Sequence, residues 1–445
     1  MERFFVKNFG CRAAQADGAA IEAGLSRNGL AAADSYGEAD VIILNSCTVT
    51  ATADDDLRQA VRRAQREQPS ARIVVTGCYA QRSPEEIAKL PGVSMVVGNS
   101  HKTSLPDLVA RRPDTADYHG EIRIGEIHSG DIFAATEFLS APIEDAAGDR
   151  TRPNLKIQDG CNNRCSFCII PFVRGRSRSA TPDQVIGEVR SLASRYREVV
   201  LSGINLGRWG RDLAHVAEAP AGRKLPWLVQ RLLDETPIER LRLSSVEPMD
   251  FSDELLEMIA TSPRIAKHVH APLQSGSDTV LRRMHRKYRP RHYEDRVRKA
   301  RALMPDAAIG ADVMTGFPGE TAAEFEDSYA FIDAMPFTYL HVFTYSERPG
   351  TPAAQREQVP VAVRKERTHR LRALAARKNL AFRQSLIGST LSVVTLDGGR
   401  RGLSSNYLKV DLASARSENL LVDVRIGGIA GESLAEQGAL HVLAQ

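Results

Sequence analysis

Three cysteines, Cys161, Cys165 and Cys168, lie close together in the string CNNRCSFC. A single loop carries all three thiols, and it is short enough to wrap around a metal cluster. A structural zinc site normally takes four protein ligands, but no histidine or fourth cysteine lies within a few residues of this group. Three thiolates suit an iron–sulfur cube that keeps one iron open for another ligand. A structural zinc loop and ordinary core thiols are the alternatives.

The other three cysteines, Cys11, Cys47 and Cys78, are more than thirty residues apart in the sequence. Each directly follows a short apolar run, in the strings FGC, NSC and TGC. In a parallel sheet the carboxyl ends of neighbouring strands share one edge, and ligands of such folds bind there. One buried cysteine is usually a small apolar core residue, but three in equivalent places predict a second three-thiolate cluster site.

Hydrophobic patterning predicts the elements that must position these thiols. Over residues 1–99, short apolar runs alternate with amphipathic stretches, which is typical of a parallel α/β domain. Residues 100–146 are polar and carry little periodicity, so we expect a linker there, with one hairpin around Ile122–Ile127. The four apolar runs of the first domain are Phe4–Phe9, Val41–Asn45, Ile73–Thr76 and Met95–Val97.

The 445 residues exceed what one hydrophobic core usually serves, so several domains are expected within an overall α/β fold. Strand and helix patterns alternate six times within residues 147–379, which predicts a partial (βα)6 barrel. Residues 380–445, after a basic amphipathic helix over Val361–Gln384, are predicted to form a small β-barrel. The expected barrel strands are Leu155–Ile157, Val199–Leu201, Leu241–Ser244, Val269–Leu273, Ile309–Met314 and Leu340–Tyr345, and the tail runs are Leu391–Leu396, Tyr407–Leu412 and Leu420–Ile426.

The CxxxCxxC spacing after the first barrel strand resembles the signature of the radical S-adenosylmethionine (SAM) superfamily, and Phe167 occupies an aromatic position common there. A three-cysteine α/β domain, this barrel and a β-tail, in that order, resemble the radical-SAM methylthiotransferase family across nearly the whole chain. The resemblance implies two 4Fe–4S clusters, one on each cysteine set, with SAM as both methyl source and radical source. It also implies that the N-terminal auxiliary cluster carries the sulfur and that the tail is an RNA-binding TRAM domain.

Polar residues and glycines follow the later barrel strands, where barrel enzymes gather their chemistry. Gly203 ends one strand in a turn that lets the backbone approach a ligand closely, and by resemblance this turn binds the amino group of SAM. Each of these motifs alone could be an ordinary turn, but together they predict a cofactor pocket. No side chain beyond the cluster ligands is predicted to be catalytic. The predicted SAM contacts are Gly203, Asn205, Ser244, Glu247, Gln274 and Asp312.

Three short stretches of sequence indicate which branch of this family the chain most resembles. NSCTVTATADDDLRQAVRRA, TGCYAQ and HVFTYSERPGTPAA look most like the branch that acts on N6-threonylcarbamoyladenosine in tRNA. That branch adds a methylthio group to carbon 2 of the base at position 37, next to the anticodon. In GCRAAQAD, Ala14 and Asp17 depart from the Asn and Glu that are usual among relatives. The alternatives are methylthiolation of isopentenyladenosine in tRNA or of an aspartate in a ribosomal protein, and a non-catalytic RNA-binding protein with structural metal.

Net charge and cysteine content limit the partners that this chain can have and the cellular compartment in which it works. The net charge of +4 and the pI near 8.7 are mildly basic, so a nucleic-acid surface must be a local patch. No apolar stretch approaches the roughly 18 residues of a membrane span, and six cysteines are too few for a secreted disulfide framework. We therefore expect a cytoplasmic protein with no membrane partner.

Basic residues gather in two places, after the QSGS string and along the basic helix, which fits a tRNA partner. Solvated helix faces are the alternative, because arginine is also a good helix former. An electron donor protein such as flavodoxin or ferredoxin is the other expected partner. The predicted RNA contacts are Arg282, Arg283, Arg286, Lys287, Arg289 and Arg291, then Arg364, Lys365, Arg367, Arg370, Arg372, Arg377 and Lys378, and in the tail Asn406, Tyr407 and Lys409.

Overall fold

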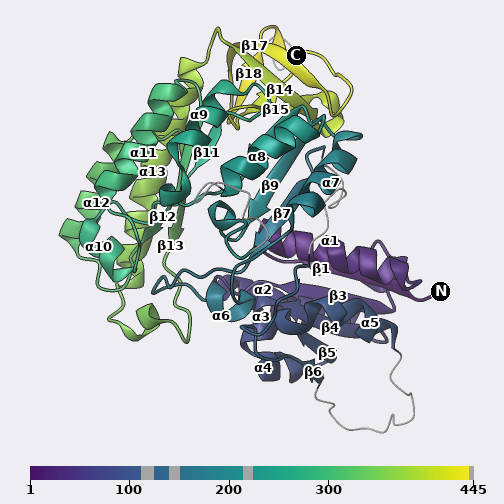
Figure 1. Ribbon diagram of the computed structural model, residues 1–445. Coiled ribbons are helices and arrows are strands. Elements are labelled where there is room, and N and C mark those ends of the chain that lie inside the picture. The colour runs from purple at the N-terminus through teal and green to yellow at the C-terminus, as the bar shows by residue number, and fades with distance from the viewer. Residues whose placement is uncertain (112–124, 140–150, 214–223, 440–445) are drawn as a thin grey trace. The chain divides into compact units, whose positions relative to one another are not determined.

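The computed structural model describes residues 1–111, 125–139, 151–213 and 224–439, and the chain divides into two compact units (Figure 1). Unit 1 comprises Met1–Ile143, Gln158–Ser179 and Ser346–Thr351. Unit 2 comprises Glu144–Ile157, Ala180–Tyr345 and Pro352–Gln445. Two short segments that come later in the sequence, Gln158–Ser179 and Ser346–Thr351, therefore belong with the N-terminal domain.

Unit 1 is built on a six-stranded parallel sheet with the strand order β2-β1-β3-β4-β5-β6. Strand β3 is buried along its whole length, as expected of a parallel strand that is covered on both faces. The predicted parallel α/β domain is confirmed. The strands are β1 (Arg3–Asn8), β2 (Ala31–Ala32), β3 (Val41–Ser46), β4 (Arg72–Gly77), β5 (Val93–Gly98) and β6 (Glu126–His128).

Helices cover both faces of this sheet because their apolar residues recur at helical spacing. In α2, Leu57, Val61 and Ala64 pack into one core cluster, and in α1, Ile21 and Leu25 pack into a second cluster. The helices are α1 (Arg12–Arg27), α2 (Ala51–Glu67), α3 (Cys78–Arg82), α4 (Pro84–Ala88), α5 (Leu105–Ala110) and α6 (Ile170–Arg174), with 3-10 turns η1 (Tyr36–Glu38) and η2 (Asn99–Ser104).

The linker predicted over residues 100–146 needs correction in its described part. Helix α5 lies within it and buries Leu105 and Val109 in the core beside α1. Strand β6 also lies within it and pairs in parallel with β5. The predicted hairpin around Ile122–Ile127 begins outside the described residues. These elements are too short to show a period in the sequence, and tertiary contacts define them.

The partial barrel consists of two sheets, with the orders β10-β9-β7-β8 and β11-β12-β13, of which β8 belongs to unit 1 and most of the rest to unit 2. Strands β7, β9 and β10 begin the alternation, and β11, β12 and β13 continue it, which confirms the predicted barrel. Strand β8 pairs antiparallel with β7, whose last two residues belong to unit 1. The strands are β7 (Asn154–Asp159), β8 (Arg178–Ser179), β9 (Glu198–Gly203), β10 (Arg240–Leu243), β11 (His268–His270), β12 (Ala308–Thr315) and β13 (Tyr339–Thr344).

The barrel helices begin at side-chain caps that the sequence encodes. Thr181 and Gln184 form a capping box on α7, and Thr321 and Glu324 form another on α12. In Figure 1, α11, α12 and α13 lie on one side of strands β12 and β13. The helices are α7 (Pro182–Ala193), α8 (Lys224–Glu235), α9 (Asp253–Thr261), α10 (Asp278–Arg283), α11 (Pro290–Leu303), α12 (Ala322–Ala334) and α13 (Val361–Ser385), with 3-10 turns η3 (Leu206–Arg208), η5 (Pro248–Asp250), η6 (Pro352–Gln355) and η7 (Asp397–Gly399).

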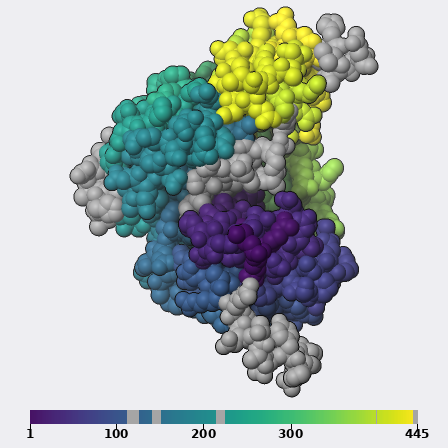
Figure 2. Space-filling model, turned by 90° about the vertical axis from the view of Figure 1, so that its right-hand side faces the viewer, coloured from purple at the N-terminus to yellow at the C-terminus, as the bar shows by residue number. Residues whose placement is uncertain are grey.

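The predicted C-terminal β-barrel is confirmed as a closed five-stranded barrel with the order β14-β15-β16-β18-β17. It forms a rounded lobe in Figure 2, where it is yellow. Alternate residues such as Leu391 and Val393 fill its core, as the period of a strand requires. The strands are β14 (Thr390–Leu396), β15 (Arg401–Ser404), β16 (Lys409–Asp411), β17 (Leu421–Ala430) and β18 (Ser433–Glu436).

A buried carboxylate joins this lobe to the barrel strands. Glu198 is fully buried and pairs with Arg242 at 2.8 Å and with Arg240 at 3.0 Å. Arg240 also donates to the carbonyl oxygen of Ser392 at 3.1 Å, and Arg242 donates to that of Ser404 at 3.0 Å. Burial would raise the pKa of Glu198, but the two guanidinium groups outweigh it and hold that pKa at about 2. The carboxylate thus keeps both arginines pointed at the lobe.

We predict that Glu198→Gln lowers the free energy of unfolding of unit 2 by about 3–5 kcal/mol, because it leaves buried guanidinium charge uncompensated. Urea unfolding followed by circular dichroism measures this. Since folding lowers the pKa of Glu198, its contribution is present above pH 4.5 and is lost as the pH falls towards about 2. Glu239→Gln, at the exposed pair with Arg197, should cost less than about 1 kcal/mol, and an equal loss in both variants would contradict the prediction.

Candidate metal centres

The structure brings Cys11, Cys47 and Cys78 to one edge of the unit 1 sheet. Each cysteine follows the carboxyl end of a strand, and the three strands β1, β3 and β4 are neighbours. Cys47 and Cys78 are buried, and Cys11 is exposed at the start of α1. This convergence is what the sequence pattern predicts for a shared site, and the role of these thiols as ligands stays a prediction.

The chain keeps this edge tightly packed with glycines placed directly before two of the cysteines. Gly10 has a φ of +89°, and a Cβ there would lie 2.7 Å from the sulfur of Cys47. Gly77 has a φ of +99°, and a Cβ there would lie 2.3 Å from the carbonyl oxygen of Ser46. Only glycine fits both the left-handed conformation and the space.

Electrostatics at this edge fit a bound cation. Burial, together with the neighbouring thiols of Cys78 and Cys11, raises the pKa of Cys47 to about 11. Three thiolates at one edge of a sheet repel one another, and a positive metal centre bound there would balance their charge and favour loss of the protons. The donor set therefore fits an iron–sulfur cluster held by three cysteines.

The second set, Cys161, Cys165 and Cys168, lies on the loop between β7 and α6. The backbone amide of Cys161 donates to the carbonyl oxygen of Gly175 at 3.1 Å, which ties the start of the loop to the end of α6. The amide of Cys168 donates to the carbonyl oxygen of Cys165 at 3.1 Å. All three residues are partly exposed, so a loop closed at its base presents three accessible thiols and fits a cluster with one open iron.

Both cysteine sets belong to unit 1, because α6 packs against the first set. Ile169 and Val173 form a core cluster with Cys78. The side-chain amide of Asn99 donates to the carbonyl oxygen of Val173 at 2.6 Å and lies 3.6 Å from the sulfur of Cys78. The sequence-based domain boundaries, 1–99 and 147–379, put the two sets in different domains, whereas the contacts group the second loop with the N-terminal sheet.

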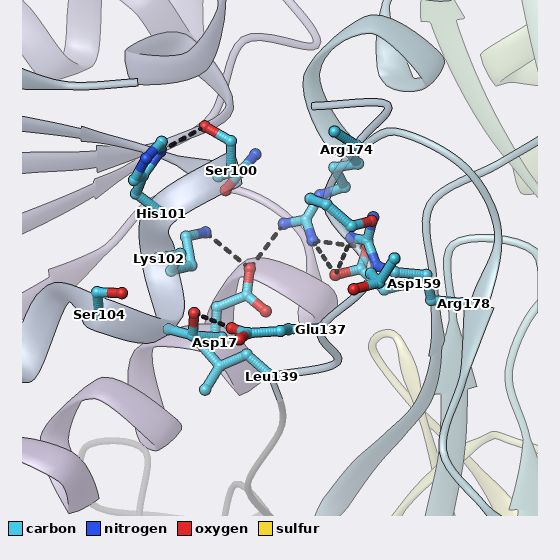
Figure 3. A pocket seen from close by; sticks show the side chains of 15 residues that line it. Asp17, Ser100, His101, Lys102, Ser104, Glu137, Leu139, Asp159, Arg174 and Arg178 are labelled. Carbon is cyan, nitrogen blue, oxygen red and sulfur yellow. Dashed lines mark hydrogen bonds and ion pairs between the residues drawn. The ribbon is translucent and has the colours of Figure 1, made fainter. Parts of the chain in front are cut away.

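A buried arginine fixes α6 in this position (Figure 3). The Arg174 side chain is 2% exposed and pairs with Asp17 at 3.0 Å and with Asp159 at 2.9 Å. Lys102 pairs with the same oxygen of Asp17 at 2.9 Å. Burial would lower the pKa of Arg174, but Asp159, the thiol of Cys78 and Asp17 raise it well above its usual value. Arg174 thus carries a fixed positive charge beside the first cysteine set.

These residues line a cavity of about 250 Å³ in unit 1. Sequence analysis noted Asp17 only as a departure from a family pattern and missed Arg174, Asp159 and Lys102. A lone arginine in the apolar string IIPFVRG was the available signal, because a charge in such a run is buried only if it is paired.

The six predicted SAM contacts all lie in unit 2; five of them end or follow a barrel strand, whereas Asp312 lies within β12. Ser244 Oγ and Gln274 Oε1 are buried and have no hydrogen-bond partner among the described residues, so they can take up polar groups of a ligand. Gly203 ends β9, and Asn205 is buried two residues beyond it. Glu247 is paired with Arg286. Their role as SAM contacts stays a prediction.

Asp312 has two partners that the sequence analysis did not name. Its Oδ1 lies 3.1 Å from Nε2 of His270 and 3.2 Å from Nδ1 of His341. One atom from each of the three side chains lies within 4.8 Å of the others. The strings HVH and LHVFTY place these histidines on β11 and β13, and only the pairing of both strands with β12 shows that they meet.

Comparison with known proteins defines the class. Residues 3–98 match the family described as Uncharacterized protein family UPF0004, and residues 155–332 match the Radical SAM superfamily. The fold is similar to that of the radical SAM methyltransferase TsrM from Kitasatospora setae, with a TM-score of 0.55, 16% identity, and coverage of 80% of this chain and 77% of that chain. The match of residues 155–332 and the similar structure together establish a radical-SAM fold.

Two relatives narrow the class to a family. The threonylcarbamoyladenosine tRNA methylthiotransferase MtaB of Bacillus subtilis is 40% identical over 383 residues, which are 84% of this chain and 82% of the relative. The tRNA-2-methylthio-N(6)-dimethylallyladenosine synthase of Saccharopolyspora erythraea is 33% identical over 434 residues, which are 96% of this chain and 84% of the relative. The chain belongs to the radical-SAM methylthiotransferase family. It is a transferase that carries two 4Fe–4S clusters and uses SAM.

We predict that Cys47→Ala and Cys165→Ala each remove one cluster and leave the other. Anaerobically reconstituted wild-type protein should hold roughly eight iron atoms per chain, and each variant roughly four. Iron and acid-labile sulfide analysis measures this, and only Cys165→Ala should lose reductive cleavage of SAM. A variant that keeps the full iron content would show that the substituted cysteine is no ligand.

We predict that Arg174→Met makes the N-terminal cluster harder to reduce, because it removes a fixed positive charge beside Cys78. In a Cys165→Ala background, the midpoint potential should fall by an amount on the order of tens of millivolts, and Arg174→Lys should restore part of it. Potentiometric titration followed by electron paramagnetic resonance measures the potential. Arg178→Met, which alters the same cavity wall, is the control, and an equal shift in both variants would contradict a specific role for Arg174.

Proposed function

We propose that this protein adds a methylthio group to carbon 2 of N6-threonylcarbamoyladenosine at position 37 of tRNA. One observation carries the proposal: both three-cysteine sets lie in unit 1, where α6 joins the second loop to Cys78. The reaction needs a radical and a sulfur atom at the same base, which fits two open cluster sites in one compact unit. Relatives named for this substrate reach 40% identity, and those named for dimethylallyladenosine, the isopentenyl branch, are 32–35% identical.

Different side chains have different roles in the proposed reaction. A cluster bound by Cys161, Cys165 and Cys168 would supply the reductive cleavage of SAM. Ser244 Oγ and Gln274 Oε1 would accept the polar groups of SAM that enter the barrel. Arg174 keeps α6 fixed and balances the thiolate charge at the first set.

The predicted RNA patches change in the structure because most of the arginines are already paired. Arg283 pairs with Glu324, and Arg286 pairs with Glu247. Along α13, the buried Arg367 pairs with Glu320, while the more exposed Arg370 and Arg377 pair with Glu326 and Asp333. Lys287 and Arg291 remain exposed beside the QSGS string and are the better candidates for phosphate contact.

The predicted RNA contacts in the tail also need correction. Asn406 is buried and donates to the carbonyl oxygen of Asp306 at 2.9 Å. Tyr407 stacks on His268, with ring centroids 4.5 Å apart. Both residues therefore hold the C-terminal lobe against the barrel, and Lys409 is the exposed member of the group.

The remaining partners follow from the chemistry. Reductive cleavage of SAM needs an electron, so a small protein donor of the flavodoxin or ferredoxin class is part of the proposal. A cytoplasmic location, where tRNA is modified, belongs to it as well. No helix in the described part of the chain combines the length and the apolar character needed to cross a bilayer.

We predict that reconstituted protein with reductant, SAM and sulfide forms the 2-methylthio derivative on tRNA that bears N6-threonylcarbamoyladenosine. Mass spectrometry of the tRNA nucleosides detects the product, and Cys165→Ala, with the N-terminal cluster intact, is the inactive control. Normal SAM cleavage without this product would refute the substrate. Product on dimethylallyladenosine, or on ribosomes, would assign the protein to another branch.

A further inference from the structure

Two exposed rings lie on the same face of β13. Leu340 and Val342 are buried, and α13 packs against β13. Because strand residues alternate between faces, Tyr339, His341 and Phe343 share the opposite face. The side chain of His341 is 56% exposed, and Phe343 is 37% exposed. An imidazole and a phenyl ring, both partly open to solvent, thus lie two residues apart on one face of β13.

A hydrogen bond to Asp312 fixes the orientation of His341. Its Nδ1 lies 3.2 Å from Oδ1 of Asp312, which also lies 3.1 Å from Nε2 of His270. Burial would raise the pKa of Asp312, but its hydrogen bonds with the two imidazoles lower it well below its usual value, so the group is a carboxylate. A carboxylate can only accept, so Nδ1 of His341 donates to it and Nε2 faces the open side.

A second layer holds this arrangement rigid. The hydroxyl of Tyr339 lies 2.7 Å from Nδ1 of His270 and 2.7 Å from Nε2 of His268. Gly310 allows the ring of Tyr339 to lie across the sheet, because a Cβ at Gly310 would come within 1.9 Å of that ring. Side chains fixed by packing and by further hydrogen bonds can hold a binding residue in one geometry.

The spacing suits a modified purine. Residues two apart on one strand face lie roughly 7 Å apart, so a base that stacks on one side chain can place a substituent on its edge against the other. Aromatic rings bind unstacked RNA bases by stacking, and polar side chains read their edges. A threonylcarbamoyl group carries a hydroxyl, a carboxylate and urea groups, whereas an isopentenyl group carries none of these. An imidazole therefore complements the first substituent and not the second.

We propose that Phe343 stacks on the target adenine and that His341, positioned by Asp312 and His270, binds the polar N6 substituent. This inference rests on the proposed function and assigns the residues that would give it substrate specificity. Asp312 and His270 act through His341 and are positioning residues.

The test compares two anticodon stem-loops that differ only at position 37, one with N6-threonylcarbamoyladenosine and one with adenosine. Fluorescence anisotropy under anaerobic conditions measures the affinity of the reconstituted full-length protein for each. Wild-type protein should prefer the threonylcarbamoyl form, and His341→Ala should reduce that preference about tenfold without weakening adenosine binding. Phe343→Leu should weaken both stem-loops about tenfold, and Phe343→Tyr should restore them.

Several controls keep the outcome clear. His369→Ala removes an exposed histidine on α13 and should change neither affinity. Asp312→Asn should reduce the preference less than His341→Ala does, because the imidazole remains but is no longer fixed. Iron content and the circular dichroism spectrum should stay at wild-type levels in the His341 and Phe343 variants, which separates a binding defect from misfolding.

Three results would overturn the inference: no preference in the wild type, an unchanged preference in His341→Ala, or a metal ion beyond the cluster iron that is lost in His341→Ala. The last would mean that His270, Asp312 and His341 hold a cation, which their ligand atoms within 4.8 Å allow. If the wild type forms the methylthio product while the variants keep their preference, only this inference fails. If the wild type forms none, the proposed function fails.

Discussion

The organisation of unit 1 depends on the burial of Arg174 between Asp17 and Asp159. A charge removed from water is tolerated only when partners surround it, so this arginine can occupy one place. That place brings α6 onto Cys78 and the second cysteine loop into the same unit as the first three thiols. Two cysteine sets that are far apart in sequence thereby share one scaffold.

Buried charge has the same role in unit 2. Glu198 directs Arg240 and Arg242 at backbone oxygens of the C-terminal lobe, and Asp312 directs His341. In each case one carboxylate orients two cationic or imidazole side chains; Glu198 is fully buried, and the Asp312 side chain is 23% exposed. An ionic contact of this kind adds little net stability, but it specifies one orientation, and both a docked lobe and a substrate contact need that.

The distribution of arginine separates two uses of positive charge. The sequence shows clusters that suggest phosphate binding, but Arg283, Arg367 and Arg370 each have a carboxylate partner. Those partners lie more than forty residues away in the sequence or on another helix, so no local pattern identifies them. The cations left exposed are fewer and are a better guide to where RNA binds.

The sequence by itself determined the strands with continuous apolar runs, such as Val41–Asn45, the alternation of strands and helices, and the two cysteine sets, because burial imposes local periods on the chain. The sequence did not predict the short elements β6, β15 and α5, because such short segments form only through contacts with neighbouring strands and helices. Only the tertiary structure decided that Arg174 joins both cysteine sets and that His270, Asp312 and His341 meet. Side chains on different strands become neighbours through strand register, and a register between distant segments is not written in either segment alone.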